Sequence, residues 1–236
     1  MKAWCPALAL IACAASPAQE RNRPMETCCS VLELRQYTLH PGKRDVLIDL
    51  FDREFIEPQE AVGMRVVGQF RDLGNPDRFV WIRGFSDMDS RREALGAFYG
   101  GPVWKAHRTA ANATMIDSDN VLLLRPLRPG SGFALGGKTR AGGPSQTIVC
   151  TIYYLDGPPD EATRRAFEQS LRQPLAALET EPAENTFPGL PVRTGENVLV
   201  SVSTVAAGPP PPALAARLVR APEELRLDPT PRSLFR

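Results

Sequence analysis

The chain has 236 residues, of which 43% are hydrophobic and 23% are charged, a balance typical of globular proteins that bury a core. Its 28 Lys and Arg residues against 27 Asp and Glu leave a formal net charge of +1, so the sequence offers no strong field for nucleic acid or for an anionic membrane surface. The five cysteines include no CxxC pair, and only two histidines accompany them. We therefore expect reduced thiols, with Cys150 buried in a strand, no metal site and no cofactor.

Residues 1–27 are predicted to form an extension ahead of the folded part. An apolar run over residues 3–15 resembles a secretory signal, and the tetrapeptide that ends at Cys13 matches a bacterial lipoprotein box. A second methionine, Met25, lies just before the first predicted strand. We favour a cytoplasmic protein that starts at Met25 over one that is exported or lipid-anchored through Cys13. No stretch reaches the roughly 18 apolar residues of a membrane-spanning helix.

Residues 28–128 are predicted to form one α+β unit. Residues 31–39 alternate and are rich in β-branched and aromatic side chains, which indicates a strand. Apolar residues then recur at three- and four-residue spacing over residues 46–55, which predicts a helix with one apolar stripe. Further strands are expected at residues 64–71, 79–85 and 121–125. One helix is expected to begin within residues 86–89 and to end at residue 98, and a second helix is expected over residues 103–111. The order βαββαβ is that of a ferredoxin-like unit.

The second half of the chain repeats this plan. Residues 129–146 are glycine-rich and are predicted as a linker, and residues 147–236 form a second, degenerate unit. Its strands are expected at residues 147–155, 175–181, 197–205 and 224–228, with helices at 159–171 and after the proline run 209–212. The segment 122–126 (LLLRP) is echoed by 225–229 (LRLDP). The predicted fold class is therefore α+β, with two tandem ferredoxin-like βαββαβ units.

Several segments resemble the NIPSNAP family. Residues 32–42 (LELRQYTLHPG) are similar to the opening strand and turn of NIPSNAP domains, and residues 65–68 and 101–104 continue the resemblance. Residues 190–193 are similar to the second unit of two-unit members. The resemblance implies a dimeric α/β barrel, in which two ferredoxin-like sheets pack with helices outside and a cavity between them. It implies no defined chemistry, because related barrels include cofactor-independent monooxygenases, isomerases and heme enzymes.

Strand alternation suggests which residues line such a cavity, because successive side chains of a strand point to opposite faces. In the first strand Leu32 and Leu34 share one face, which we expect beneath the helices. The other face is mixed in character, and we expect it to face the barrel interior. Its members are Glu33, Arg35, Tyr37, Gln69, Arg71, Trp81, Arg83 and Arg125. Guanidiniums that converge with Tyr and Trp would suit a small anionic or aromatic ligand. In the second unit the matching face is hydroxylic, with Thr151, Tyr153, Ser201 and Ser203.

The two histidines, His40 and His107, are the side chains that titrate near neutral pH. No pattern places either beside a nucleophile or a carboxylate, so the catalytic residues are unknown, and we add His107 to the ligand-binding candidates. The segment 132–139 fits the spacing GxxxxGK[ST] of a phosphate-binding loop. We set this match aside, because the glycines and proline that follow cannot propagate the helix that such a loop requires.

Three functions remain open. The first is a barrel that binds a small organic anion or an aromatic ligand. The second is a cofactor-independent monooxygenase or isomerase that uses Tyr37, His40 or His107 for proton transfer. The third is an interaction protein whose barrel serves as a dimerisation device. In each case we expect a homodimer, because the open face of a four-stranded sheet must be covered.

Overall fold

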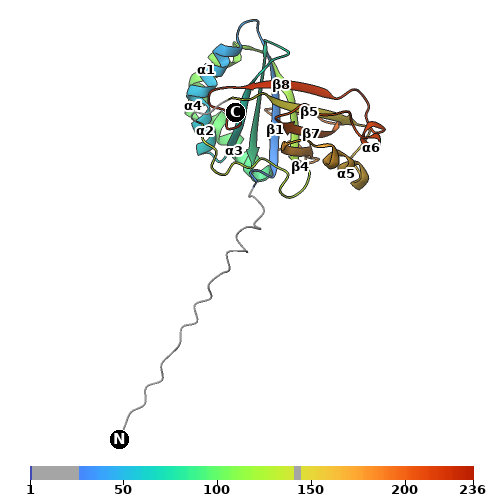
Figure 1. Ribbon diagram of the computed structural model, residues 1–236. Helices are drawn as coiled ribbons and strands as arrows, with labels where there is room; N and C mark the ends of the chain where they lie inside the picture. Colours follow the sequence, from blue (N-terminus) through green and yellow to red (C-terminus); the bar gives the residue numbers. More distant parts are fainter. Residues whose placement is uncertain (2–26, 141–144) are drawn as a thin grey trace.

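A computed structural model describes residues 1, 27–140 and 145–236 of the chain, and it is an α+β structure (Figure 1). The elements of the first half are β1 (Val31–Leu39), α1 (Arg44–Glu54), α2 (Ile56–Ala61), β2 (Arg65–Asp72), β3 (Arg78–Phe85), α3 (Met88–Gly100), α4 (Pro102–Asn112) and β4 (Met115–Pro126). Those of the second half are β5 (Ile148–Leu155), α5 (Glu161–Ser170), β6 (Pro174–Thr180), β7 (Asn197–Ser203), α6 (Pro212–Ala215) and β8 (Glu223–Pro229). The predicted strands and longer helices are all found, with ends that differ by a few residues and a β4 that starts earlier.

The eight strands form one closed barrel with the order β1-β3-β2-β8-β5-β7-β6-β4. The first unit contributes the row β4-β1-β3-β2 and the second the equivalent row β8-β5-β7-β6, which is the ferredoxin-like order in both cases. Antiparallel pairs join the rows, β2 with β8 at one seam and β4 with β6 at the other. The tandem ferredoxin-like fold is confirmed, and one chain closes the barrel that the family resemblance implied for a dimer.

The barrel interior is filled by apolar side chains from all eight strands, among them Leu32 and Leu34 of β1. Phe133 and Phe235, from outside the strands, join this cluster with their ring centroids 5.1 Å apart. An eight-stranded barrel is just wide enough for side chains to fill it, so its inward set is apolar. The expected assignment of faces is therefore inverted, because the aliphatic face of β1 lies inside and not beneath the helices.

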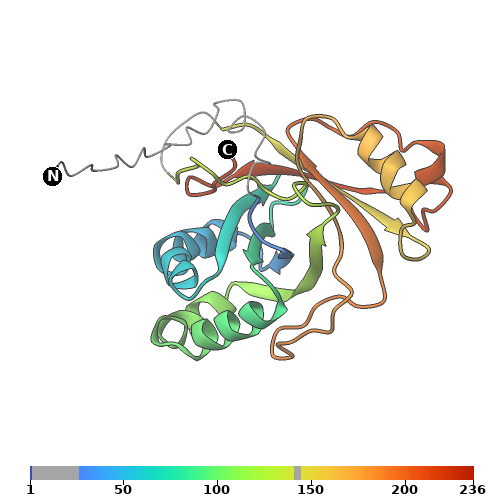
Figure 2. The ribbon, with the colours of Figure 1, turned by 90° about the horizontal axis from the view of Figure 1, so that it is seen from below.

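Helices cover the outer faces of both units (Figure 2). On the first unit, α1 to α4 pack against the face of the sheet that carries Tyr37, Trp81 and Leu123. On the second unit, α5 and α6 cover Tyr153 and Leu199. The two helical layers lie on opposite sides of the barrel, so each unit has its own compartment between sheet and helices.

A bulge in β2 changes which residues of that strand face the helices. The pairing of β2 with β3 shifts register between Val66 and Gly68. Val66 packs beneath the helices, whereas Val67 and Phe70 both pack inside the barrel. Strict alternation would place residues 66 and 70 on the same face, so it does not hold for this strand.

The remaining expectations concern the N-terminal extension, the cysteines and membrane-spanning helices. The signal-like run, Cys13 and Met25 lie outside the described residues. Cys28 and Cys29 form a disulfide, so the expectation of reduced thiols is wrong for this pair. Cys150 is a free, buried thiol in β5, and burial raises its pKa to about 12. No helix of the described residues is long and apolar enough to cross a membrane.

Candidate functional site

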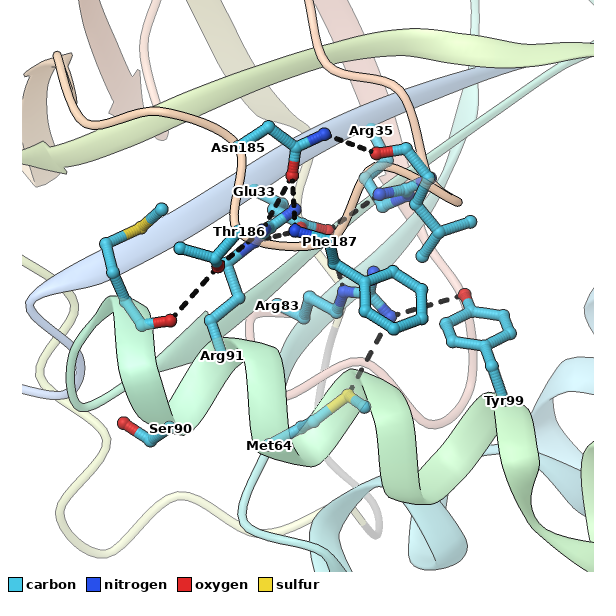
Figure 3. Close-up of polar contacts among 12 residues, drawn as sticks. Glu33, Arg35, Met64, Arg83, Ser90, Arg91, Tyr99, Asn185, Thr186 and Phe187 are labelled. Atoms are coloured by element: carbon cyan, nitrogen blue, oxygen red, sulfur yellow. Dashed lines mark hydrogen bonds and ion pairs between the residues drawn. The ribbon is translucent and has the colours of Figure 1, made fainter.

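The compartment beneath α3 contains one carboxylate that binds three arginines (Figure 3). Glu33 Oε2 accepts from Arg35 Nη1 and from Arg83 Nε, each at 2.7 Å. Its other oxygen, Oε1, accepts from Arg91 Nε at 2.7 Å. All four side chains are at most 1% exposed to solvent. We call these residues the Glu33 cluster.

Three elements place these side chains together. Glu33 on β1 is paired directly with Arg83 on β3, and Arg35 lies two residues along β1 on the same outer face. Arg91 comes from the first turns of α3, whose buried stripe also includes Ala94. Asp87 fixes the start of this helix with a capping box, in which its carboxylate accepts from the backbone N–H of Ser90 at 2.7 Å.

The Glu33 cluster carries an excess of positive charge. Burial alone would raise the pKa of Glu33, but Arg83, Arg35 and Arg91 outweigh it and hold the pKa well below its usual range. Glu33 is therefore ionised, and one negative charge faces three guanidiniums. Within the described part of the chain, Nη2 of Arg83 and Nη2 of Arg91 are buried and have no hydrogen-bond partner. Buried charges of this kind are costly unless they are paired.

An aromatic cavity of about 30 Å³ adjoins the Glu33 cluster. Its lining residues are Tyr37, Leu47, Phe51, Phe55, Gln59, Trp81, Phe98, Tyr99, Trp104, Ala111 and Met115. The guanidinium carbon of Arg83 lies 5.0 Å from the ring centroid of Trp81, and that of Arg35 lies 5.4 Å from the ring of Tyr37. Guanidiniums therefore contact both the carboxylate and the aromatic wall.

The polar atoms at this cavity are mainly hydrogen-bond donors. Tyr37 OH accepts from Arg35 Nε at 3.0 Å, and Tyr99 OH accepts from Arg83 Nη1 at 3.4 Å, so each hydroxyl hydrogen stays free to donate. Burial raises the pKa of Tyr37, and its phenol is neutral at neutral pH. The indole Nε1 of Trp81 is buried without an acceptor among the described residues. The site can therefore receive a ligand with acceptor oxygens and negative charge.

The β6–β7 segment of the second unit, residues 181–196, closes this compartment from outside. Asn185 Oδ1 accepts from Arg91 Nη1 at 2.9 Å, and Thr186 Oγ donates to the carbonyl of Met88 at 3.1 Å. The ring of Phe187 lies beside that of Tyr99, with centroids 6.1 Å apart (Figure 3). The two units of the chain thus meet at the site.

The structure brings five of the nine predicted site residues together and separates the rest. Those together are Glu33, Arg35, Tyr37, Trp81 and Arg83, and they lie beneath the helices. Their expected position in the barrel interior is wrong, because the apolar residues of all eight strands occupy it. Gln69 is buried across from Trp81 in the β2–β3 pairing, and neither of its amide atoms has a partner in the described residues.

The other three candidates are engaged elsewhere. Arg71 Nε donates to Asp45 at 2.8 Å, and Arg125 Nη2 lies 2.8 Å from Glu179. His107 Nε2 lies 3.5 Å from Glu54 on the helical surface. His40 is exposed at the end of β1.

Sequence reasoning missed Arg91, Gln59, Tyr99 and Asn185. Gln59 Oε1 accepts from Arg83 Nη1 at 3.1 Å and so belongs to the same network. Arg91 carried a readable signal, because it occupies the apolar stripe of α3 three and four residues before Ala94 and Leu95. A charge on such a stripe needs a buried partner. Asn185 carried no such signal, because it lies in a long loop of the other unit.

The hydroxylic residues predicted in the second unit are also buried. Thr151, Tyr153, Ser201 and Ser203 are buried in β5 and β7. Tyr153 lies beneath α5, with its ring 5.6 Å from that of Phe167. Among the described residues, no group of three or more His, Cys, Asp or Glu side chains is placed to hold a metal ion.

Comparison with known proteins finds a family match within the first unit. Residues 32–129 match the model of the NIPSNAP family. A NIPSNAP family protein with unknown function from Agrobacterium tumefaciens is 23% identical, over 42% of this chain and 88% of that chain, with a TM-score of 0.39. A search of curated proteins gives no match for the chain.

Two solved structures are similar over both units. A putative monooxygenase from Fusobacterium nucleatum has a TM-score of 0.53 at 8% identity, with 84% of this chain and 91% of that chain covered. A putative monooxygenase from Lactobacillus acidophilus has a TM-score of 0.50 at 12% identity, with 84% and 92% covered. At such low identity the likeness shows the fold alone.

Proposed function

We propose that the Glu33 cluster and its aromatic cavity bind a small organic anion with an aromatic ring, such as an aryl carboxylate. The observation that carries the proposal is the ratio of one buried carboxylate to three buried guanidiniums. A second carboxylate, supplied by a ligand, would accept from the free Nη2 atoms of Arg83 and Arg91. It would also offset the remaining positive charge.

The aromatic part of such a ligand would occupy the adjoining cavity. At about 30 Å³ this cavity has room for little more than water, so a ring enters only when the wall moves. The outer side of the wall is the more exposed one, because Tyr99 and Trp104 are half-buried whereas Trp81 and Phe51 are fully buried. The half-buried ring of Phe187 lies against that of Tyr99 on this side. We therefore expect the ligand ring to displace the outer aromatic side chains and to stack on Trp81.

Binding is better supported than turnover. A monooxygenase or an isomerase would need a group that accepts a proton from the substrate. No histidine lines the described cavity, and the raised pKa of Tyr37 makes its phenol a weak acid that is neutral at neutral pH. Tyr37 can donate a hydrogen bond to a ligand oxygen, which is a binding role. A function limited to interaction with other proteins would not explain the buried guanidinium nitrogens that have no partner among the described residues.

Isothermal titration with benzoate tests the proposal, with benzamide as the neutral isostere. We expect one benzoate per chain, and binding of benzamide at least about tenfold weaker because it lacks the charge. Arg83→Gln should weaken benzoate binding by about tenfold or more, and Tyr37→Phe by about fivefold, the loss of one hydrogen bond. Arg71→Gln, which changes an arginine outside the site, is the matched control.

The near-ultraviolet circular dichroism of each variant shows whether it is folded. Equal affinity for benzoate and benzamide would contradict the proposal. A folded Arg83→Gln variant that binds benzoate as tightly as the wild type does would contradict it as well.

The homodimer remains a prediction. The open sheet faces that motivated it cover each other within one chain, so a dimer of the whole chain must use another surface. Static light scattering at micromolar concentration measures the mass, and a monodisperse monomer would contradict the prediction.

A further inference from the structure

The β6–β7 segment contacts the site through few interactions. Residues 185–187 provide the hydrogen bonds to Arg91 and to the Met88 carbonyl and the ring contact with Tyr99. Within the segment, Asn185 Nδ2 donates to the carbonyl of Leu190, and the N–H of Phe187 donates to Asn185 Oδ1. The tip of the segment is thus also linked by bonds of its own, which connect residues 185, 187 and 190.

The segment also has space behind it. A cavity of about 340 Å³ lies between the segment and the barrel wall at Leu122 and Leu123, and the segment itself provides most of the lining. The two ends of the segment are bound to β4, because the backbone N–H groups of Glu181 and Arg193 donate to the carbonyls of Leu123 and Val121. Asn185 lines this cavity on one side and binds Arg91 on the other. The ends of the segment are therefore anchored to the barrel, while its tip at residues 185–187 has space behind it.

We infer that residues 185–187 are a removable cover of the site, in which Asn185 positions Arg91 and Phe187 closes the aromatic cavity. This inference rests on the proposed anion-binding function. Phe187 lies over the half-buried Tyr99, so its departure opens the wall that a ligand ring must pass. Asn185 holds one nitrogen of Arg91 while Glu33 holds another, which aims the remaining Nη2. The second unit thereby supplies a part of the site that the first unit does not provide.

Rapid mixing with benzoate tests the cover. A Trp4→Phe background leaves Trp81 and Trp104, which both line the cavity, as the fluorescent reporters. Phe187→Ala should raise the association and dissociation rates together by about tenfold, with less than about a threefold change in affinity, because a cover slows both directions. Asn185→Ala should weaken binding by about threefold to tenfold, mainly through faster dissociation, because Arg91 loses its orientation. Glu184→Ala, in the same segment but exposed, is the control and should leave all rates unchanged.

A second measurement needs no ligand. Acrylamide quenching of the two tryptophans should be greater in Phe187→Ala than in the wild type and in Glu184→Ala. If the wild type binds benzoate and Phe187→Ala keeps wild-type rates, the cover is wrong and the proposed function stands. If the wild type binds no benzoate, the proposed function fails, and unchanged quenching in Phe187→Ala would overturn the cover as well.

Discussion

Glu33 connects two strands and a helix through three short ion pairs, all of them removed from solvent. Exposed ion pairs contribute little to stability, whereas loss of one partner from a buried pair leaves an uncompensated charge. In this cluster positive charge is already in excess, so loss of Glu33 would leave three buried guanidiniums without a carboxylate.

We predict that Glu33→Gln lowers the free energy of unfolding by about 3–5 kcal/mol, because three buried guanidiniums then have no carboxylate. Guanidinium chloride unfolding followed by circular dichroism measures the change. Glu54→Gln, at a one-third-exposed carboxylate near His107, should cost less than about 0.5 kcal/mol. Equal effects of the two substitutions would show that the cluster is not a buried ionic centre.

Asp52 of α1 is a second residue whose surroundings predict a measurable effect. Burial raises the pKa of Asp52 from 3.8 to about 6, against the nearby charges of Arg232, Arg71 and Arg140, and Asp49 adds to the shift. The folded protein therefore holds the proton more tightly than the unfolded chain does. Stability from this group is present below about pH 4 and is lost as the pH rises to about 6.

Asp52→Asn should accordingly stabilise the protein at pH 8, by about 1 kcal/mol after allowance for its partial exposure, and should have no effect at pH 4. Melting temperatures at the two pH values check this. A destabilisation at pH 8 would mean that the attraction of the nearby arginine charges outweighs the cost of burial.

The sequence indicated which side chains of the site share one face of a strand. It did not indicate whether that face lies inside the barrel or beneath the helices. Alternation correctly grouped Glu33, Arg35 and Tyr37 on one face of β1. It could not decide which face is inside, because a closed barrel and a helical layer both bury what they cover. The decision depends on barrel closure, which involves seams between residues more than 50 positions apart.

At the scale of elements, the sequence predicted order and type well, since periodicity and turn residues are local signals. The bulge in β2 was not predicted, because it depends on the neighbouring strand. Gly68 marks its position, and a Cβ there would meet the ring of Phe70. Among the helices, α3 matters most to the proposed site, because its first turns hold Arg91.

We predict that Asp87→Ala lowers the free energy of unfolding by about 1 kcal/mol, since the N–H of Ser90 loses its acceptor at the start of α3. The same variant should weaken benzoate binding by about twofold to threefold, because fraying of the first turns disturbs Arg91. Asp89→Ala, in the same turn and without a capping bond, is the control for both measurements. Identical results for the two variants would show that the capping bond of Asp87 contributes neither to stability nor to benzoate binding.

At the scale of the whole molecule, the two units take equivalent places in one barrel, each with the same strand order. Separated from the second unit, the first would expose the edges of β2 and β4 and one apolar sheet face. We therefore predict that residues 28–128 alone associate as a dimer that rebuilds the barrel from two copies. Light scattering at micromolar concentration checks the mass, and a stable monomer would contradict the equivalence of the two seams.

Because one polypeptide closes the whole barrel, the sequences of its two halves can also change independently of each other. When two identical chains build such a structure, every substitution occurs twice, and a residue that suits the binding compartment must also suit its symmetry mate. Here each half mutates independently. The first half keeps an ionic centre, while Thr151, Tyr153, Ser201 and Ser203 occupy the opposite half. The outcome is an asymmetric barrel, in which the β6–β7 segment of one half contacts the buried charge cluster of the other.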